Sequence, residues 1–137
     1  RYDCIVMSHV IEHLPNSTTL IKNLVELLKP GGYLFIEYPG VNSLKLKSTR
    51  NRKWVRGTSN FYDDKTHVAI YKREDLALLL TNLNMIVLKS DIRRNWYFIL
   101  LSPIILLFRF FNNKGALNGS DLWDFTGFAE VIYAKNK

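Results

Sequence analysis

Three side chains that could carry chemistry lie close together near the start of the chain. His9 precedes Glu12 by three residues and His13 by four. Side chains at those spacings meet on one face if the segment begins a helical turn. Two imidazoles and a carboxylate can accept a substrate proton or bind a divalent ion, and imidazole suits zinc or another transition metal better than magnesium. The alternative is that Glu12 and His13 only form hydrogen bonds with neighbouring backbone.

Two short apolar runs frame this segment and predict how it is positioned. Residues 4–10 are almost continuously apolar, which is typical of a strand buried on both faces of a parallel sheet. Residues 20–28 place their apolar side chains on one side of a helix, which the Lys-Pro-Gly-Gly sequence at 29–32 ends. Residues 33–38 form a second strand. We therefore expect a strand–helix–strand unit with parallel strands.

The carboxyl ends of these two strands are the expected ligand-binding edge, because ligands of open α/β sheets collect there. Ser8, His9 and Val10 lie at the end of the first strand. The alternative for Ser8 and Val10 is packing at the strand end. Tyr38 ends the second strand, where it either reaches a substrate or packs.

Residues 41–66 are too long for a simple connection, so we predict a functional loop. Six Lys and Arg residues lie between Lys45 and Arg56, with Trp54 among them. Such a stretch can bind phosphate or stack on a base or sugar, or it can be a solvated loop. Tyr62 is a further candidate for substrate contact.

The rest of the chain predicts one more helix, over 76–83, and strands over 85–89 and 128–134. Residues 96–111 form an apolar run that is shorter than a membrane-spanning helix and is broken by Ser-Pro at 102–103. A buried cap helix or a dimer surface would account for it. The other alternative is a helix lying in a membrane interface, flanked by arginines.

Composition bounds the function classes. The chain has 137 residues, enough for one domain, and its 47% hydrophobic content excludes a disordered chain. A formal net charge of +7 favours anionic partners, among them phosphorylated substrates, nucleic acid and acidic membranes. A single cysteine cannot form an internal disulfide, which suits a cytoplasmic setting.

Two segments carry a family resemblance. Residues 2–14, YDCIVMSHVIEHL, and residues 27–37, LLKPGGYLFIE, resemble the middle of class I S-adenosylmethionine (SAM)-dependent methyltransferases. Asp64, His67 and the following helix resemble the branch that includes ubiquinone-biosynthesis O-methyltransferases. The resemblance implies an α/β fold, the C-terminal half of a Rossmann-like methyltransferase, with flanking helices and a mixed sheet in family order 4-5-7-6. It also implies that the glycine-rich half is missing from 1–137 and that 95–114 is an insertion.

The resemblance assigns roles to the candidate residues. Ser8, His9 and Val10 would line the methionine part of SAM, and His67 would return toward the pocket of His13. In related branches a similar motif binds a divalent metal, which implies the ligand set His9, Glu12, His13 and His67. The alternative is that His13 or His67 acts as the catalytic base or contacts the substrate.

The expected reaction is methyl transfer to a small molecule, at an oxygen of a sugar, glycan precursor or lipid-linked metabolite, and the positive net charge favours an anionic acceptor. Tyr38, Trp54 and Tyr62 are the substrate candidates. The rivals are an RNA ribose methyltransferase, although nucleic acid is the less expected partner, and a non-catalytic interaction module. Further expected partners are a membrane surface through 96–111 and a second copy of the chain.

Overall fold

The computed structural model describes residues 1–50, 52–112 and 117–137, and it begins with the predicted strand–helix–strand unit. Strand β1 (Tyr2–Ser8) is followed by helix α1 (Ser17–Glu26) and strand β2 (Leu28–Pro39). β1 and β2 pair in parallel, with Ile5 opposite Leu34 and Ser8 opposite Glu37. The prediction of two neighbouring parallel strands is confirmed.

Four strands form the main sheet, in the order β1-β2-β6-β4. β6 (Ala129–Asn136) runs antiparallel to both β2 and β4 (Met85–Ile92). This is the order and the mixed direction expected from the resemblance. Because β6 opposes both of its neighbours, β1, β2 and β4 all run the same way and end at one edge of the sheet.

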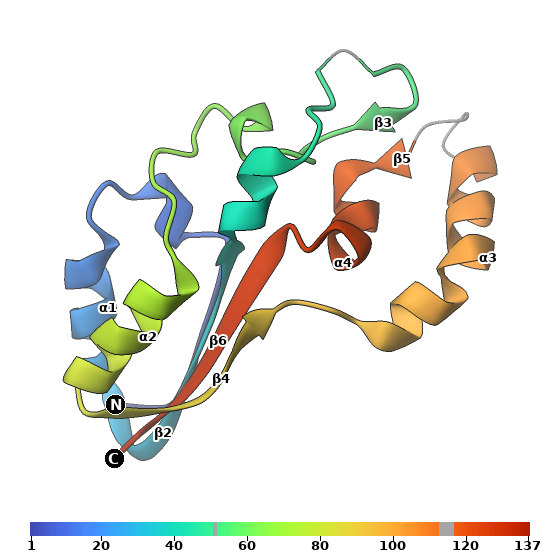
Figure 1. The fold of residues 1–137 in the computed structure, drawn as a ribbon. Coiled ribbons are helices and arrows are strands. Elements are labelled where there is room, and N and C mark those ends of the chain that lie inside the picture. Colours follow the sequence, from blue (N-terminus) through green and yellow to red (C-terminus); the bar gives the residue numbers. More distant parts are fainter. Residues whose placement is uncertain (51, 113–116) are drawn as a thin grey trace.

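Helices α1 and α2 (Arg73–Asn82) lie side by side on one face of the sheet (Figure 1). Alternate residues of a strand point to opposite faces, so Leu34 and Ile36 of β2 both point toward the helices. They are fully buried there with Ile21 of α1 and Leu80 of α2. This one-sided core fixes the register of the strands and therefore the positions of the residues at their ends.

The other face of the sheet has no helix over it among the described residues. Val6 is 67% exposed, Leu88 is 52% exposed, and Cys4 is also exposed. The expectation that residues 4–10 are buried on both faces is therefore wrong for this structure. No layer packs over this face among the described residues, so the apolar side chains that β1 presents there are exposed.

The predicted loop over 41–66 is mostly irregular, and Asp63 holds it together. Its carboxylate accepts hydrogen bonds from the backbone N–H of Asn60 at 2.8 Å and of Ser59 at 2.9 Å. Burial alone would raise the pKa of Asp63, but the hydrogen bonds outweigh it and lower the pKa to about 2. The loop contains the short elements η2 (Val41–Lys45), β3 (Val55–Arg56) and η3 (Phe61–Asp63). Asn51 lies outside the described residues.

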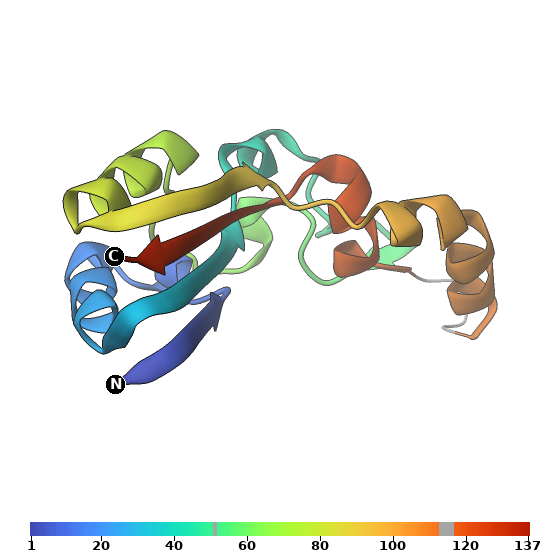
Figure 2. The ribbon, with the colours of Figure 1, turned by 90° about the horizontal axis from the view of Figure 1, so that it is seen from below.

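The predicted apolar segment forms helix α3 (Trp96–Asn112), which stands away from the sheet at the end opposite the two termini (Figure 2). Pro103 lies inside this helix, and Figure 1 shows the helix bending in its middle. The hydroxyl of Ser102 donates to the carbonyl of Ile99 at 2.6 Å, which satisfies the group that proline leaves without a donor.

Most large apolar side chains of α3 are exposed, so the expectation of a buried cap helix is wrong for the described residues. Among the helices of the described part of the chain, none is long and apolar enough to cross a bilayer. Residues 113–116, which include the last two residues of the predicted insertion over 95–114, lie outside the described residues. The remaining elements are β5 (Leu117–Asn118), η4 (Gly119–Leu122) and α4 (Trp123–Thr126).

Candidate functional site

Charged side chains meet where the three parallel strands end. His9 follows β1, Glu37 lies near the end of β2, and Arg93 follows β4. The Nε2 atom of His9 lies 3.2 Å from Oε1 of Glu37, and Nη1 of Arg93 donates to the same oxygen at 2.9 Å. Asp124 of α4 accepts from Nη2 of Arg93 at 3.0 Å. These residues are far apart in the sequence, and the sheet places them next to one another.

His9 occupies the left-handed backbone region, with φ of 53°. Histidine is among the side chains that tolerate this region best, and the conformation turns the chain sharply after β1. The ring is thereby held between two carboxylates, with Nδ1 at 3.1 Å from Oε1 of Glu12 and Nε2 facing Glu37. Burial alone would lower the pKa of His9, but the hydrogen bonds to Glu12 and Glu37 outweigh it and raise the pKa to about 9. At neutral pH His9 is therefore a cation with both N–H groups engaged.

The raised pKa of His9 predicts a pH-dependent stability. Since the folded-state pKa of about 9 lies above the ordinary value of 6.5, the stabilisation is complete below pH 6.5 and is lost as pH rises through 9. We expect the free energy of unfolding to fall by on the order of 2 kcal/mol over this range. Urea denaturation at several pH values measures it, with the His9 ring titrated by NMR. Glu37→Gln should lower the pKa of His9 and flatten the profile, whereas an unchanged profile would contradict the assignment.

A second group, Glu12, His13 and His67, lies beside the first. Each offers one ligand atom, and these atoms lie within 4.8 Å of one another. The Nε2 atoms of both histidines are 3.9 Å from Oε1 of Glu12. Glu12 is only 1% exposed, and its other oxygen, Oε2, has no hydrogen-bond partner among the described residues. A buried carboxylate oxygen without a hydrogen-bond donor lowers the stability of the fold. Such unpaired oxygens occur at functional sites.

The imidazoles of His13 and His67 are held from their other sides. Nδ1 of His67 lies 2.7 Å from the carbonyl of Phe61, which fixes that nitrogen as the donor. Nδ1 of His13 lies 3.2 Å from the carbonyl of Thr66. This leaves the Nε2 lone pairs facing Glu12. A hydrogen bond from one ring nitrogen to a carbonyl, with the other nitrogen free, is typical of metal-binding or proton-accepting histidines. Three such ligands with an open position fit a transition metal ion.

The structure separates the other candidates. Ser8 is exposed at the end of β1, Val10 is 38% exposed beside it, and Tyr62 is 63% exposed next to Phe61. Tyr38, in contrast, is 1% exposed, and its hydroxyl donates to Glu130 at 3.2 Å within the helix-side core. The packing alternative therefore describes Tyr38. Trp54 directly precedes β3, and Figure 1 shows β3 well away from η1 (Ile11–His13).

Four side chains of the strand-end cluster were not predicted. Glu37 and Arg93 lie at the carboxyl ends of parallel strands, as His9 does. The rule that ligands bind at this edge of the sheet could therefore have identified them from the sequence. Trp123 and Asp124 belong to the four-residue helix α4, for which the sequence carries no periodic pattern. The ring of Trp123 lies 4.5 Å from that of Phe128, centroid to centroid, and 4.8 Å from that of His9. It forms an aromatic wall beside the cationic imidazole.

Comparison with known proteins gives one family and several solved structures. A family model described as a methyltransferase domain matches residues 1–90. A SAM-dependent methyltransferase from Archaeoglobus fulgidus is 23% identical with a TM-score of 0.54, and the match covers 98% of this chain and 59% of that one. The search of curated proteins finds no match.

Two further structures are similar in fold. The (4+2)-cyclase SpnF is 14% identical with a TM-score of 0.52, over 98% of this chain and 49% of that one. An O-methyltransferase from a trans-AT PKS multienzyme of Brevibacillus brevis, in complex with S-adenosyl-L-homocysteine, is 15% identical with a TM-score of 0.51, over 99% and 44%. At these identities the likeness concerns the fold. This chain spans about half the length of these proteins.

Proposed function

This chain belongs to the methyltransferase domain family, and on that premise we propose that it forms the acceptor-side half of a SAM-dependent methyltransferase site. The observation that carries the proposal is the strand-end cluster, where two cations face three carboxylates: His9 and Arg93 against Glu12, Glu37 and Asp124. The carboxylates of Glu12 and Glu37 lie on either side of the His9 ring, beside the ring of Trp123, and they favour a cationic ligand such as the sulfonium of SAM.

The reaction that this arrangement would serve is an in-line displacement. The acceptor oxygen bonds to the methyl carbon while the carbon–sulfur bond breaks, and its electron pair goes to sulfur to leave a neutral thioether. The acceptor must also lose a proton. His13 or His67 is the proposed base, because an Nε2 lone pair faces the site, whereas protonated His9 cannot accept a proton. The protein must otherwise align the acceptor with the methyl group and exclude water.

Calorimetry tests the proposal on the protein at its full natural length. We expect one SAM per chain and comparable binding of S-adenosylhomocysteine. The absence of heat with both ligands, together with the absence of a thermal shift, would overturn the proposal and favour a non-catalytic module. If the protein binds SAM and also binds RNA with an affinity that falls steeply with salt, the acceptor would instead be an RNA ribose.

The proposed acceptor is an oxygen of a small molecule, such as a sugar, a glycan precursor or a lipid-linked metabolite. Exposed Tyr62 lies on the same short element as Phe61, whose carbonyl holds His67, so it is the aromatic side chain placed to contact an acceptor. Acceptor panels assayed by release of S-adenosylhomocysteine test this choice. Tyr62→Ala should raise KM for the acceptor and leave SAM affinity unchanged.

As the alternative to a base role for His13 or His67, we propose that Glu12, His13 and His67 hold a divalent transition metal. A metal at this position would polarise the acceptor oxygen and favour loss of its proton. We expect Co2+ to give visible absorption bands, and His67→Ala to weaken its binding at least tenfold. His9→Asn is the matched control, since the ring of His9 is already engaged by Glu12 and Glu37. Equal loss in both variants would restore His9 to the ligand set, and the absence of bands in the wild type would exclude the site.

A further inference from the structure

Helix α3 presents an apolar surface to solvent, and we propose that it docks the protein on an anionic lipid bilayer. The helix would lie flat, with its outer face in the headgroup region. A 17-residue helix is about 26 Å long, and it does not qualify as a membrane span. The proposal goes beyond methyl transfer and does not depend on it.

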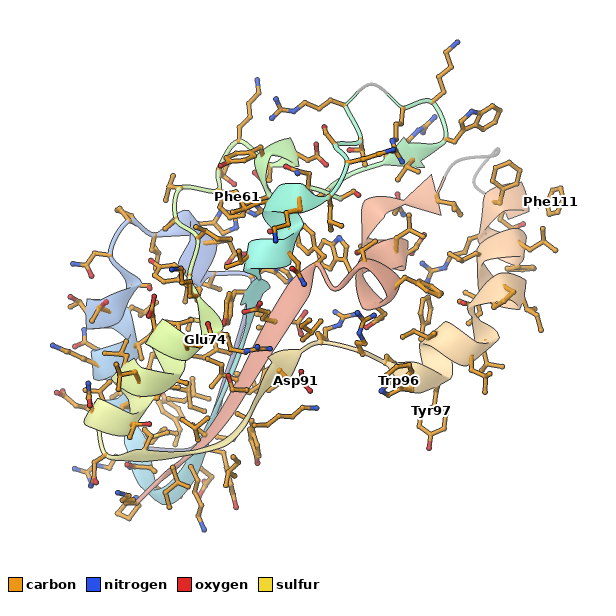
Figure 3. The ribbon with its side chains drawn as sticks, in the orientation of Figure 1. Phe61, Glu74, Asp91, Trp96, Tyr97 and Phe111 are labelled. Atoms are coloured by element: carbon orange, nitrogen blue, oxygen red, sulfur yellow. The ribbon has the colours of Figure 1, made fainter. Side chains whose placement is uncertain are left out.

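The outer face of α3 is defined by eight large side chains that are at least half exposed. At 100° per residue they occupy one continuous arc of about 140°, with no polar residue among them. Tyr97 points away from the body at one end of the helix, and Phe111 does so at the other (Figure 3). The eight are Trp96, Tyr97, Leu100, Leu101, Ile104, Leu107, Phe108 and Phe111.

Positive charge is gathered in the basic stretch of 45–56, where six Lys and Arg residues have no Asp or Glu among them. Of the arginines on and beside α3, Arg93 is paired with Glu37 and Asp124, and Arg109 is paired with Asp121. The basic stretch of 45–56 adjoins the C-terminal end of α3. Trp54 lies against Phe110, with ring centroids 6.2 Å apart, and its carbonyl accepts from the N–H of Leu117 at 2.8 Å.

The N-terminal end of α3 carries cations as well. A hollow there is lined by Lys89, Asp91, Ile92, Arg94 and Trp96. Trp96 is 70% exposed and Tyr97 is 84% exposed, so aromatic side chains with polar atoms stand at this end of the outer face, and Trp54 stands near the other. Trp and Tyr prefer the membrane–water boundary, and basic residues beside them attract anionic headgroups.

Charge decides between a bilayer and a second copy of the chain. In a two-fold symmetric dimer the same surface would meet itself, so the cations around α3 would face one another. An anionic bilayer neutralises these cations and covers the apolar arc at the same time. A helix with one strongly apolar face and neighbouring basic residues is the arrangement that lies in membrane interfaces.

Vesicle sedimentation of the full-length protein tests the proposal. We expect binding to vesicles of phosphatidylcholine with phosphatidylglycerol at least tenfold stronger than to phosphatidylcholine alone, and weaker binding in high salt. The double variant L100E/I104E should lose at least tenfold in binding. The matched control is Leu78→Glu, since Leu78 is an apolar residue of α2 that is 61% exposed.

A second double variant, R52E/K53E, should lower binding to the anionic vesicles while leaving the apolar face intact. The proposal is overturned if the wild type binds neither kind of vesicle. It is also overturned if light scattering shows a dimer that L100E/I104E converts to a monomer without changing vesicle binding. The second result would assign α3 to a protein interface.

Discussion

Replacing Val10 with arginine is expected to weaken SAM binding by about a hundredfold, equivalent to about 3 kcal/mol. Val10 directly follows His9 at the edge where β1 ends, and it is 38% exposed, so a larger side chain can be placed there without disrupting the core. Arginine would fill the space proposed for the methionine part of SAM and would set a second cation against the sulfonium. Calorimetry with SAM and S-adenosylhomocysteine measures the effect.

Leu78→Arg is the matched control for that variant. It adds the same side chain at an exposed apolar position of α2, and Leu78 is not among the residues at the strand ends. We expect unchanged affinity in the control and unchanged thermal stability in both variants. Equal affinity of Val10→Arg and the wild type would remove Val10 from the proposed cofactor contacts.

Replacing Asp124 with alanine is expected to lower the free energy of unfolding by about 3 kcal/mol. Asp124 is 4% exposed, and its carboxylate accepts from both Nη2 of Arg93 and the backbone N–H of Asn95 at 3.0 Å. Removing it leaves the N–H of Asn95 without that acceptor and leaves Arg93 with Glu37 as its remaining carboxylate partner. Because the side chain of Arg93 is 33% exposed, water offsets part of the loss.

Asp124→Asn separates charge from shape in this experiment. The amide keeps one oxygen for the N–H of Asn95 but loses the charge that faces Arg93, so about half of the loss should remain. Urea denaturation of all three proteins gives the comparison. A loss below 1 kcal/mol in Asp124→Ala would mean that the ion pair contributes little to folding.

Much of the fold could be predicted from the sequence because its patterns are local. The apolar run before His9 and the one-sided apolar pattern of 20–28 predict β1 and α1, and the parallel pair β1–β2 follows from their order. The helix ends at Glu26, two residues before the predicted end, and the Lys-Pro-Gly-Gly sequence lies within β2. The position of β6 between β2 and β4 is a long-range pairing. The family resemblance predicts this position, whereas no local sequence pattern does.

What the sequence did not predict depends on contacts between distant segments. Arg93 and Asp124 are 31 residues apart, and they meet because β4 ends at the edge where β6 begins. Tyr38 is buried rather than open to substrate because its partner Glu130 lies opposite it on β6. The sequence left open whether α3 is a buried cap helix, a dimer surface or a membrane-interface helix, for another reason. A helix that is apolar all round has no polar stripe to mark its outer face.

The central claim is that the shared edge of β1 and β2 faces the methyl donor. A crystal structure of the full-length protein grown with S-adenosylhomocysteine tests it most directly. We predict that its sulfur lies over the carboxyl ends of β1 and β2, with Ser8, His9 and Val10 in contact with the homocysteine portion. A ligand bound on the helix-covered face, or against α3, would contradict the proposed site.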